Sequence, residues 1–293
     1  MNFHLPLLQK RVCAIHDLSG FGRASLTLVI PILASLGIQV CPLPTAVLSS
    51  QTSGMQGFSF LDLTASMYDF LAHWKELGLR FDCVYSGFLG NPQQIEIAQV
   101  CIDELLNKNG FAFVDPVLGD NGVLDPTQTK EMVDAQRNLV RRADIIAPNL
   151  TEAAFLLNEP YCETIPLHAL KDQLIALADF GPAYVIITSA PASNDSLCSV
   201  VAYEKESKRF WRVENKRYPV FYPGTGDTFS SVIVGELLSG ASIPLALSRA
   251  VSFVSYGIAL TYGYGTPPTD GVLLEQTLFL LREDHCPVHY EEI

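Results

Sequence analysis

Segments typical of apolar strands alternate with segments typical of helices along most of this 293-residue chain, and the connections between them are short. We expect strands over residues 11–17, 38–48, 81–89, 111–120, 144–149 and 183–189. We expect helices over residues 23–36, 61–77, 92–107, 127–142 and 167–179, and one that starts at Thr151. Parallel strands need a long crossover between them, usually a helix, so this alternation predicts an α/β protein. Its sheet should be mainly parallel and covered by helices on both faces.

Three further features complete the expected organisation. Residues 197–213 read as a β-hairpin with charged residues at its tip. The apolar spacing after the Gly-Thr-Gly-Asp stretch at 224–227 predicts a helix that stops near Gly240. Pro31 lies inside the helix expected over 23–36 and should kink or split it. No repeat, low-complexity tract or linker is evident, so we expect a single domain over residues 1–293.

The composition limits the classes of function. With 48% hydrophobic and 17% charged residues the chain should fold, and a net charge of -12 argues against binding to nucleic acid or to anionic membranes. Residues 24–61 carry no charge, but prolines, glycines and glutamines interrupt this segment, so we expect a buried helix and strand instead of a membrane span. The N-terminus has no signal-peptide pattern. Seven cysteines without metal-ligand spacing suit reduced thiols of a cytoplasmic protein, and they stand at positions 13, 41, 83, 101, 162, 198 and 286.

Polar residues gather just after the expected strands. Parallel sheets bind ligands at the carboxyl ends of their strands, so these residues mark the expected site. The candidate residues at these strand ends, including one aromatic residue and one glycine, are Asp17, Ser19, Phe88, Gly90, Asp115, Asp120, Asn149, Glu152, Thr188 and Ser189, followed by residues 224–227.

The Gly-Thr-Gly-Asp stretch itself suggests chemistry on a phosphate. Gly224 and Gly226 suit a tight loop that another molecule can approach closely, and the start of the helix behind it offers unpaired N–H groups to an anion. A carboxylate at Asp227 would repel a phosphate unless it takes the proton from a hydroxyl group that attacks that phosphate. In the alternative interpretation, Thr225 or Asp227 simply caps the helix.

Two common nucleotide-binding motifs are absent. The chain has no Gly-x-x-x-x-Gly-Lys-Ser/Thr, which excludes a P-loop kinase. The stretch "GFGRAS" after the first strand lacks the third glycine of a dinucleotide-binding loop, and no acidic residue follows about twenty positions later.

Four motifs in order, "IHDLSGFGRAS", "VDPVLGDNG", "PNLTEA" and "PGTGDTFSS", span nearly the whole chain. Together they resemble the ribokinase superfamily, in its vitamin-kinase branch of pyridoxal kinases and hydroxymethylpyrimidine kinases. The resemblance implies a three-layer α/β/α sandwich with a mainly parallel central sheet and a small β-hairpin flap. It also implies ATP as co-substrate, Mg²⁺, a homodimer, and a monovalent cation whose requirement the sequence leaves open.

The resemblance also implies roles for individual residues. Asp227 falls on the position of the general base, and Gly224, Thr225 and Gly226 fall on the anion hole that holds the transferring phosphoryl group. Asp115 and Glu152 fall on acidic positions that organise Mg²⁺. The positions near the nucleotide phosphates are Asp120, Asn149, Thr188 and Ser189. Two structural alternatives stay open, namely a turn at Asp115 before Pro116 and a helix capping box made by Asn149 and Glu152.

The residues that bear on the substrate resemble two different branches of kinases. The aspartate of Gly-Thr-Gly-Asp and the proline in "VIPILASLG" resemble pyridoxal kinases, whereas pyrimidine kinases typically have cysteine in place of Asp227. Phe88 falls where an aromatic side chain would stack on a pyridine ring, and its alternative is a plain core residue. Asp17 departs from the pyridoxal kinase pattern toward the pyrimidine kinases, and Gln51 and Ser53 also differ from it. The substrate-binding positions implied by the resemblance are Asp17, Ser19, Val47, Ser53 and Phe88.

We therefore expect ATP-dependent phosphorylation of the hydroxymethyl group of pyridoxal, pyridoxine or pyridoxamine. The first alternative is a hydroxymethylpyrimidine or phosphomethylpyrimidine kinase of thiamine synthesis. The second is a vitamin or nucleotide sensor without catalytic activity on the same fold, because a fold does not determine a function. A sugar kinase is disfavoured, since the Gly-Gly-rich N-terminal region of that branch is missing.

Overall fold

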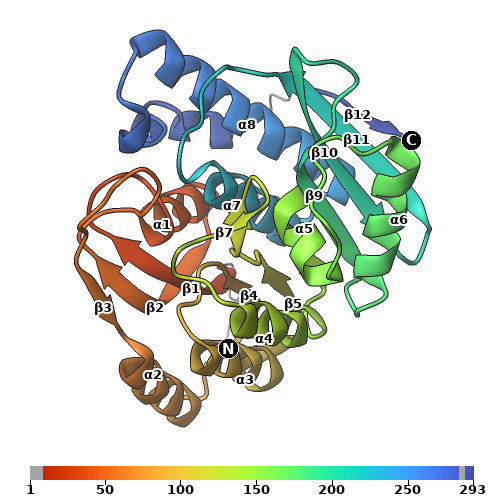
Figure 1. The fold of residues 1–293 in the computed structure, drawn as a ribbon. Helices are drawn as coiled ribbons and strands as arrows, with labels where there is room; N and C mark the ends of the chain where they lie inside the picture. The colour runs from red at the N-terminus through yellow and green to blue at the C-terminus, as the bar shows by residue number, and fades with distance from the viewer. Residues whose placement is uncertain (1–8, 284–287) are drawn as a thin grey trace, which may run out of the picture.

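The central element of the protein is a ten-stranded sheet with the strand order β12-β11-β10-β9-β8-β5-β4-β1-β2-β3. Figure 1 shows the fold of this computed structural model as a ribbon. The structure describes residues 9–283 and 288–293. Six neighbouring strands are parallel, and they are β2 (Gln39–Leu48), β1 (Arg11–Ser19), β4 (Phe81–Ser86), β5 (Leu106–Val114), β8 (Ile145–Ile146) and β9 (Tyr184–Ala190). The expected mainly parallel sheet is therefore confirmed.

Antiparallel strands extend both edges of this parallel core. On one side β3 (Phe60–Asp62) pairs with β2, and on the other β10 (Leu197–Glu204), β11 (Arg209–Lys216) and β12 (Tyr290–Glu292) follow β9. The hairpin expected over 197–213 is thus present as β10 and β11, and it continues the main sheet. A separate two-stranded sheet consists of β6 (Gly119–Asp120) and β7 (Val123–Leu124).

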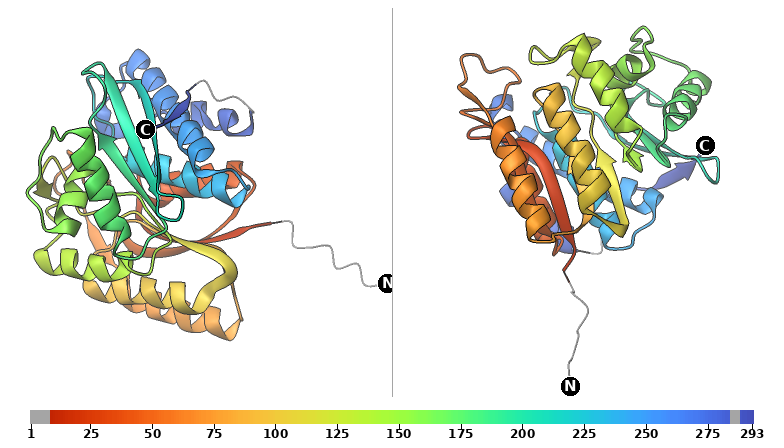
Figure 2. Two further views of the ribbon diagram at one scale, coloured as in Figure 1. Left: turned by 90° about the vertical axis from the view of Figure 1, so that its right-hand side faces the viewer. Right: turned by 90° about the horizontal axis from the view of Figure 1, so that it is seen from below.

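Helices cover both faces of the sheet, which Figure 2 shows from two further directions. One face carries α1 (Leu26–Ser35), α7 (Thr225–Leu238) and α8 (Ile243–Tyr264). The other carries α2 (Thr64–Glu76), α3 (Pro92–Leu105), α4 (Lys130–Val140), α5 (Leu150–Leu157) and α6 (Leu167–Ala178). Short 3₁₀ turns follow α8 at Pro268–Asp270, Leu274–Gln276 and Leu278–Arg282.

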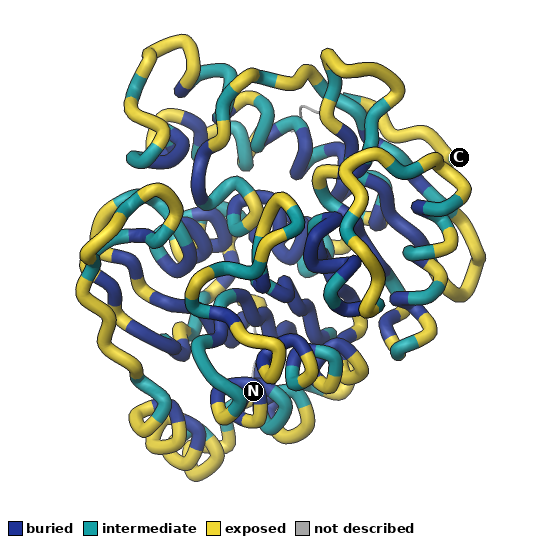
Figure 3. The backbone as a smooth tube through the Cα atoms, in the orientation of Figure 1, coloured by how far each residue is buried: buried dark blue, intermediate teal, exposed yellow. Residues whose placement is uncertain are grey.

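The sheet separates two hydrophobic clusters because successive side chains of a strand point to opposite faces. In β1, Val12 and Ala14 belong to the cluster beneath α1, α7 and α8, whereas Cys13 and Ile15 belong to the cluster beneath the other helices. All four side chains are fully buried, and Figure 3 shows that burial is concentrated along the strands and on the helix faces that meet them. This pattern explains why the parallel strands read as continuous apolar runs in the sequence.

Several element boundaries differ from the expectation. The first helix begins at Leu26 instead of residue 23. It is continuous from Leu26 to Ser35 with Pro31 inside it, so the proline does not split the helix. The second helix begins at Thr64, since Phe60–Asp62 forms β3. The structure also adds α8, which the sequence pattern did not lead us to expect.

By length and composition, α8 is the one helix in the described part of the chain that could cross a membrane. It packs against α7 and β11, and 44% of its most apolar stretch is buried inside the protein. These are ordinary properties of a core helix, so α8 gives only weak evidence for a membrane span.

The described cysteines are all free thiols. Cys13, Cys83 and Cys101 are buried, Cys41 is partly buried, and Cys162 and Cys198 are exposed. The expectation of reduced thiols agrees with these positions, and Cys286 lies outside the described residues.

Candidate active site

The carboxyl ends of the parallel strands meet along one edge of the sheet. The backbone N–H of Gly87 donates to the carbonyl of Ile15 over 3.0 Å, and that of Asp115 donates to the carbonyl of Ser86 over 2.9 Å. The chain runs outward from β1 to β2 and then returns to the other side of β1 at β4. Ligands of open α/β sheets bind at such a reversal, so the ends of β1 and β4 define the floor of the site.

The first turn of α7 lies at this edge of the sheet, where Asp227 meets the segment after β1, and the first N–H groups of a helix have no partner within that helix. Gly224 is the residue that precedes the helix, its φ of 78° is left-handed, and no side chain caps the helix. A Cβ atom at Gly224 would lie 2.3 Å from the carbonyl oxygen of Arg23, so only glycine fits. A Cβ atom at Gly226 would meet nothing within 4 Å, which leaves open space in front of the turn. Such a turn can accept an anion.

The capping alternative for this stretch is wrong. The hydroxyl of Thr225 donates to the carbonyl of Tyr222 over 3.1 Å, and the carboxylate of Asp227 accepts from the backbone N–H of Ser25 over 2.9 Å. Neither side chain caps α7. Asp227 is therefore held by a residue that is 202 positions away along the chain.

The environment of Asp227 suits a proton acceptor. Its side chain keeps 15% exposure. Burial above all, together with the carboxyl groups of Asp115 and Asp17, raises the pKa of Asp227 to about 7, although the N–H of Ser25 acts in the opposite direction. A base is most effective when its pKa lies near the working pH, and this carboxyl group has such a pKa.

Asp17 is positioned by two hydroxyl groups. The hydroxyl of Ser19 donates to Asp17 over 2.8 Å, and the hydroxyl of Ser25 donates to its other oxygen. Burial raises the pKa of Asp17. Ser25 therefore connects Asp17 to Asp227, and it adopts a left-handed φ of 51° to do so. Sequence reasoning missed Ser25, because nothing in "GFGRAS" signals this backbone conformation.

Asp115 and Glu152 form a buried acidic pair. The hydroxyl of Ser230 donates to Asp115 over 2.9 Å, and this contact ties the end of β5 to α7. Burial raises the pKa of Asp115 to about 7, and burial together with the charge of Asp115 raises that of Glu152 well above its usual range. Both groups would be stabilised as carboxylates by a nearby cation.

Glu152 also has a structural role, as the second alternative held. Its two oxygens accept from the backbone N–H groups of Asn149, over 2.7 Å, and Leu118, over 3.1 Å. The side chain of Asn149 accepts in turn from the N–H of Glu152, so the two residues form a capping box at the start of α5. A capping role and a role in metal binding are compatible, because each carboxylate oxygen has more than one lone pair.

The residues expected near the nucleotide phosphates lie close together. The side-chain amide of Asn149 donates to Asp120 over 3.1 Å and to the carbonyl of Gly119 over 2.9 Å. Asn149 also forms a parallel bridge with Thr188. Ser189 follows with a left-handed φ of 55° and is exposed. The structure thus joins the ends of β8 and β9 to the β6–β7 hairpin.

The residues expected to bind the acceptor substrate are less tightly connected. Val47 is 37% exposed in β2, and Ser53 is exposed in the loop that follows, where its N–H donates to the side chain of Gln51. Phe88 is partly buried and belongs to neither hydrophobic cluster, so the alternative of a plain core residue is not supported. Its carbonyl accepts from the hydroxyl of Thr45 over 3.1 Å.

His16 is a site residue that sequence reasoning missed. Its ring is completely buried, and its Nδ1 atom lies 3.9 Å from the Oδ1 atom of Asp227. Neither ring nitrogen has a hydrogen-bond partner among the described residues. A histidine before Asp17 was visible in the motif, but its approach to Asp227 depends on tertiary structure.

The acidic pair fits Mg²⁺ better than a metal held by many side chains. No group of three or more His, Cys, Asp or Glu side chains among residues 9–283 and 288–293 could hold a metal ion. Mg²⁺ commonly uses one or two carboxylates together with water and substrate phosphates. The Oδ1 atom of Asp115 receives no hydrogen bond from the described residues, so it remains available to such an ion.

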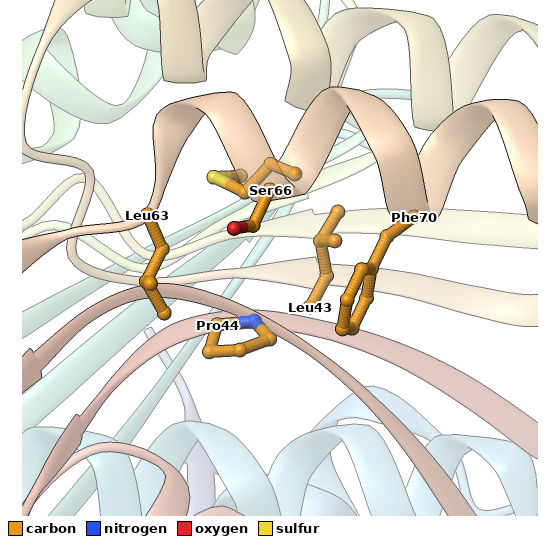
Figure 4. Close-up of a pocket in the computed structure, with 6 residues that line it drawn as sticks. Leu43, Pro44, Leu63, Ser66 and Phe70 are labelled. Carbon is orange, nitrogen blue, oxygen red and sulfur yellow. The ribbon is translucent and has the colours of Figure 1, made fainter.

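A small hollow of about 160 Å³ lies elsewhere, between β2 and the start of α2. Figure 4 shows Leu43 and Pro44 from β2 facing Leu63, Ser66 and Phe70. None of its lining residues is among those expected in the site, so we do not assign the active site to this hollow.

Comparison with known proteins decides the family. The sequence profile of the phosphomethylpyrimidine kinases matches residues 30–270, which is most of the chain. The chain belongs to the phosphomethylpyrimidine kinase family. This assignment confirms the resemblance and the ribokinase-like fold expected from the four motifs.

Solved structures of relatives agree with this family. A protein of Bacteroides thetaiotaomicron, provisionally described as a phosphomethylpyrimidine kinase and crystallised with pyridoxal, is 48% identical with a TM-score of 0.93, covering 97% of this chain and 99% of its own. A pyridoxal kinase from Lactobacillus plantarum is 31% identical with a TM-score of 0.85, covering 93% and 96%. Among curated relatives, the pyridoxal kinase PdxY of Burkholderia orbicola is 28% identical over 263 residues, covering 86% of this chain and 89% of that protein.

Proposed function

We propose that this family member transfers the γ-phosphoryl group of ATP to the hydroxymethyl group of a B6 vitamer, namely pyridoxal, pyridoxine or pyridoxamine. The observation that carries the proposal is the placement of Asp227, a carboxyl group with a pKa of about 7 in the uncapped first turn of α7. The relatives called pyridoxal or pyridoxine kinases, and the 48% identical relative crystallised with pyridoxal, support the choice of substrate.

The reaction follows from this arrangement. Asp227 takes the proton of the hydroxymethyl group while the oxygen of that group attacks the γ-phosphorus of ATP. The bond between the γ-phosphorus and the bridging oxygen breaks, and ADP leaves with its electron pair. The N–H groups of the turn at Gly224, Thr225 and Gly226 hold the phosphoryl oxygens as negative charge moves through them.

Asp115 and Glu152 are the residues that would hold Mg²⁺. The ion, when bound, neutralises charge on the phosphates of ATP. The cluster of Asp120, Asn149, Thr188 and Ser189 is proposed to lie near those phosphates, and Asp17, Ser19, Val47, Ser53 and Phe88 are proposed to contact the acceptor.

The finer organisation is part of the same proposal. We take residues 1–293 as one kinase domain that works as a homodimer in the cytoplasm. A monovalent cation, in addition to Mg²⁺, would help to neutralise the charge of the same phosphates.

A hydroxymethylpyrimidine or phosphomethylpyrimidine kinase is the second candidate, and the carboxyl group of Asp17 at the end of β1 favours it. The aspartate at position 227 favours the B6 vitamers, since the pyrimidine kinases typically have cysteine there. One experiment separates the candidates. The purified protein is given Mg-ATP with pyridoxal, pyridoxine, pyridoxamine or hydroxymethylpyrimidine, and phosphorylated product is measured by mass spectrometry.

We expect the three B6 vitamers to be phosphorylated faster than hydroxymethylpyrimidine. Product from hydroxymethylpyrimidine alone would overturn the choice of substrate. Binding of a vitamer without any turnover of ATP would instead identify a sensor on the same fold.

A further inference from the structure

We infer that His16 is a positioning residue for Asp227, donating its Nδ1–H to Oδ1 of that carboxylate when the acceptor substrate is bound. This inference rests on the proposed function, in which Asp227 is the base. It concerns a side chain to which neither the motifs nor the family resemblance gave a role.

The side chain of His16 is enclosed on several sides and lies beside Asp227. Its ring is completely buried, and Nδ1 is 3.9 Å from Oδ1 of Asp227. Tyr85 packs edge-on against it with 4.3 Å between the ring centroids. A Cβ atom at Gly87 would lie 2.3 Å from Nδ1, so only a glycine leaves room for the ring at this position after β4. These contacts hold the imidazole in one place beside the base.

Packing alone does not account for an imidazole at this position. Both ring nitrogens are buried without a hydrogen-bond partner among the described residues. Burying polar atoms without partners costs free energy, whereas an apolar ring of similar shape would avoid that cost. Unpaired buried groups of this kind call for a functional explanation, and the nearest functional group is Asp227.

The second oxygen of Asp227 is already held. The N–H of Ser25 donates to Oδ2 over 2.9 Å, which leaves Oδ1 as the oxygen that faces His16. A distance of 3.9 Å is too long for a hydrogen bond. Catalytic hydrogen bonds are often long before the substrate binds and shorten in the complex. With both oxygens held, the carboxylate plane would be directed at the hydroxyl group of the acceptor.

The charge state of His16 suits this role. Burial lowers the pKa of His16 to about 3, so its ring is neutral at working pH. The titratable groups that act on Asp227 are the carboxyls of Asp17 and Asp115, and the phenol of Tyr85 feels the charge of Asp227 in turn. A cation beside Asp227 would lower its pKa and weaken it as a base. A neutral N–H donor orients the carboxylate and lowers its pKa less than a cation would.

The test compares His16→Phe with His16→Gln. Phenylalanine keeps the ring shape but has no N–H, and glutamine keeps an N–H donor. The control is Ser248→Ala, which removes a buried hydroxyl of α8 that has no partner among the described residues. For each protein we would measure kcat, both KM values, the pH dependence of kcat and the Tm.

We expect His16→Phe to lower kcat by about 10- to 100-fold, the range for a hydrogen bond to a charged group. Its KM for ATP should not rise, and its Tm should not fall. Losing a donor to the carboxylate raises the pKa of Asp227, so the rise of kcat with pH should move to higher pH. His16→Gln should recover part of kcat, and Ser248→Ala should keep the wild-type kcat.

Two outcomes would overturn the inference. One is an unchanged kcat and pH profile in His16→Phe, and the other is a parallel loss of kcat, both KM values and Tm, which indicates packing alone. If His16→Phe does not fold, ¹⁵N NMR of the wild-type protein with pyridoxal bound can show which ring nitrogen of His16 carries the proton. A neutral ring protonated at Nδ1 supports the inference, and protonation at Nε2 contradicts it. The NMR measurement needs no turnover, so it tests the role of His16 even if the wild-type protein is inactive. Inactivity of the wild-type protein would refute only the proposed function.

Discussion

Asp227 receives opposing influences from its neighbours, and their balance determines its chemistry. Burial and two carboxyl groups raise the pKa of Asp227 to about 7, whereas the N–H of Ser25 lowers it. We predict that Asp227→Asn keeps the fold and ATP binding but lowers kcat by roughly 10² to 10⁴, the usual range for losing a general base. The amide has nearly the same size but cannot accept the proton. Steady-state kinetics and a thermal melt check this, and an unchanged kcat would remove the main support for the kinase mechanism.

The same carboxyl group predicts the pH dependence of the reaction. The pKa of Asp227 is about 7. At a pH below this value the carboxyl group is mostly protonated and cannot act as a base, and at a higher pH it can accept a proton. We therefore expect kcat to rise with pH through about 7 and then to level off. The profile is measured at saturating ATP and acceptor. A kcat that is flat between pH 5 and 8 would mean that another group accepts the proton.

Phe88 tests the acceptor side of the site. It is partly buried at the end of β4 and belongs to neither hydrophobic cluster. We predict that Phe88→Ala raises the KM for pyridoxal and leaves the KM for ATP nearly unchanged. Loss of ring stacking should cost about 1 kcal/mol or more. Equal increases in both KM values, together with a lower Tm, would indicate that the change loosens the fold instead.

The start of α7 uses its two glycines for different reasons. A Cβ atom at Gly224 would clash with the carbonyl of Arg23 at 2.3 Å, and the φ of 78° disfavours any other residue. We predict that Gly224→Ala lowers stability by more than about 1 kcal/mol, since alanine fits poorly where φ is positive. A chemical denaturation curve measures this change.

Gly226 is the matched comparison within the same turn. A Cβ atom there meets nothing within 4 Å, so Gly226→Ala should fold at least as well as the wild type. Its methyl group would occupy the space into which the phosphoryl oxygens must come, so kcat should fall. A stable and fully active Gly226→Ala would show that no phosphate approaches this turn.

At the scale of the whole molecule, the fold gathers acidic side chains from three separate elements. Asp17 lies near the end of β1, Asp115 follows β5 and Asp227 lies in α7, and burial raises the pKa of each. Holding these groups together is costly without a cation. We predict that turnover requires a divalent metal ion. Asp115→Asn should weaken the binding of this ion and so raise the Mg²⁺ concentration that gives the half-maximal rate. Full activity in excess chelator would contradict the prediction.

Asp115→Asn is a cleaner variant than Glu152→Gln. Both oxygens of Glu152 accept backbone N–H groups, so glutamine would lose one of these bonds and lower stability as well as metal affinity. The control is Asp172→Asn, an exposed carboxylate of α6, which should leave the Mg²⁺ dependence unchanged.

Local patterns in the sequence were sufficient for most of the fold. Strand and helix periodicity depends on neighbouring residues, and the alternation of the two predicted a parallel sheet because parallel strands need crossovers. The hairpin at 197–213 and the polar residues at the strand ends followed from the same reasoning. The starts of α1 and α2 were misjudged, because the unusual φ of Ser25 and the short strand β3 arise from contacts with distant segments.

The class of fold and the motif residues could be predicted from the sequence, since both are encoded within short stretches of chain. How these residues act on one another depends on the packing of the folded protein. Asp227 is bonded to Ser25 across 202 positions and lies 3.9 Å from Nδ1 of His16, and Asp115 is bonded to Ser230 across 115 positions. Burial and the charges of neighbouring carboxylates raise the pKa of Asp227 and of Asp115 to about 7, and both effects exist only after β1, β5 and α7 pack together. Electrostatic coupling depends on distance in space and on the exclusion of water, and the order of residues along the chain specifies neither directly.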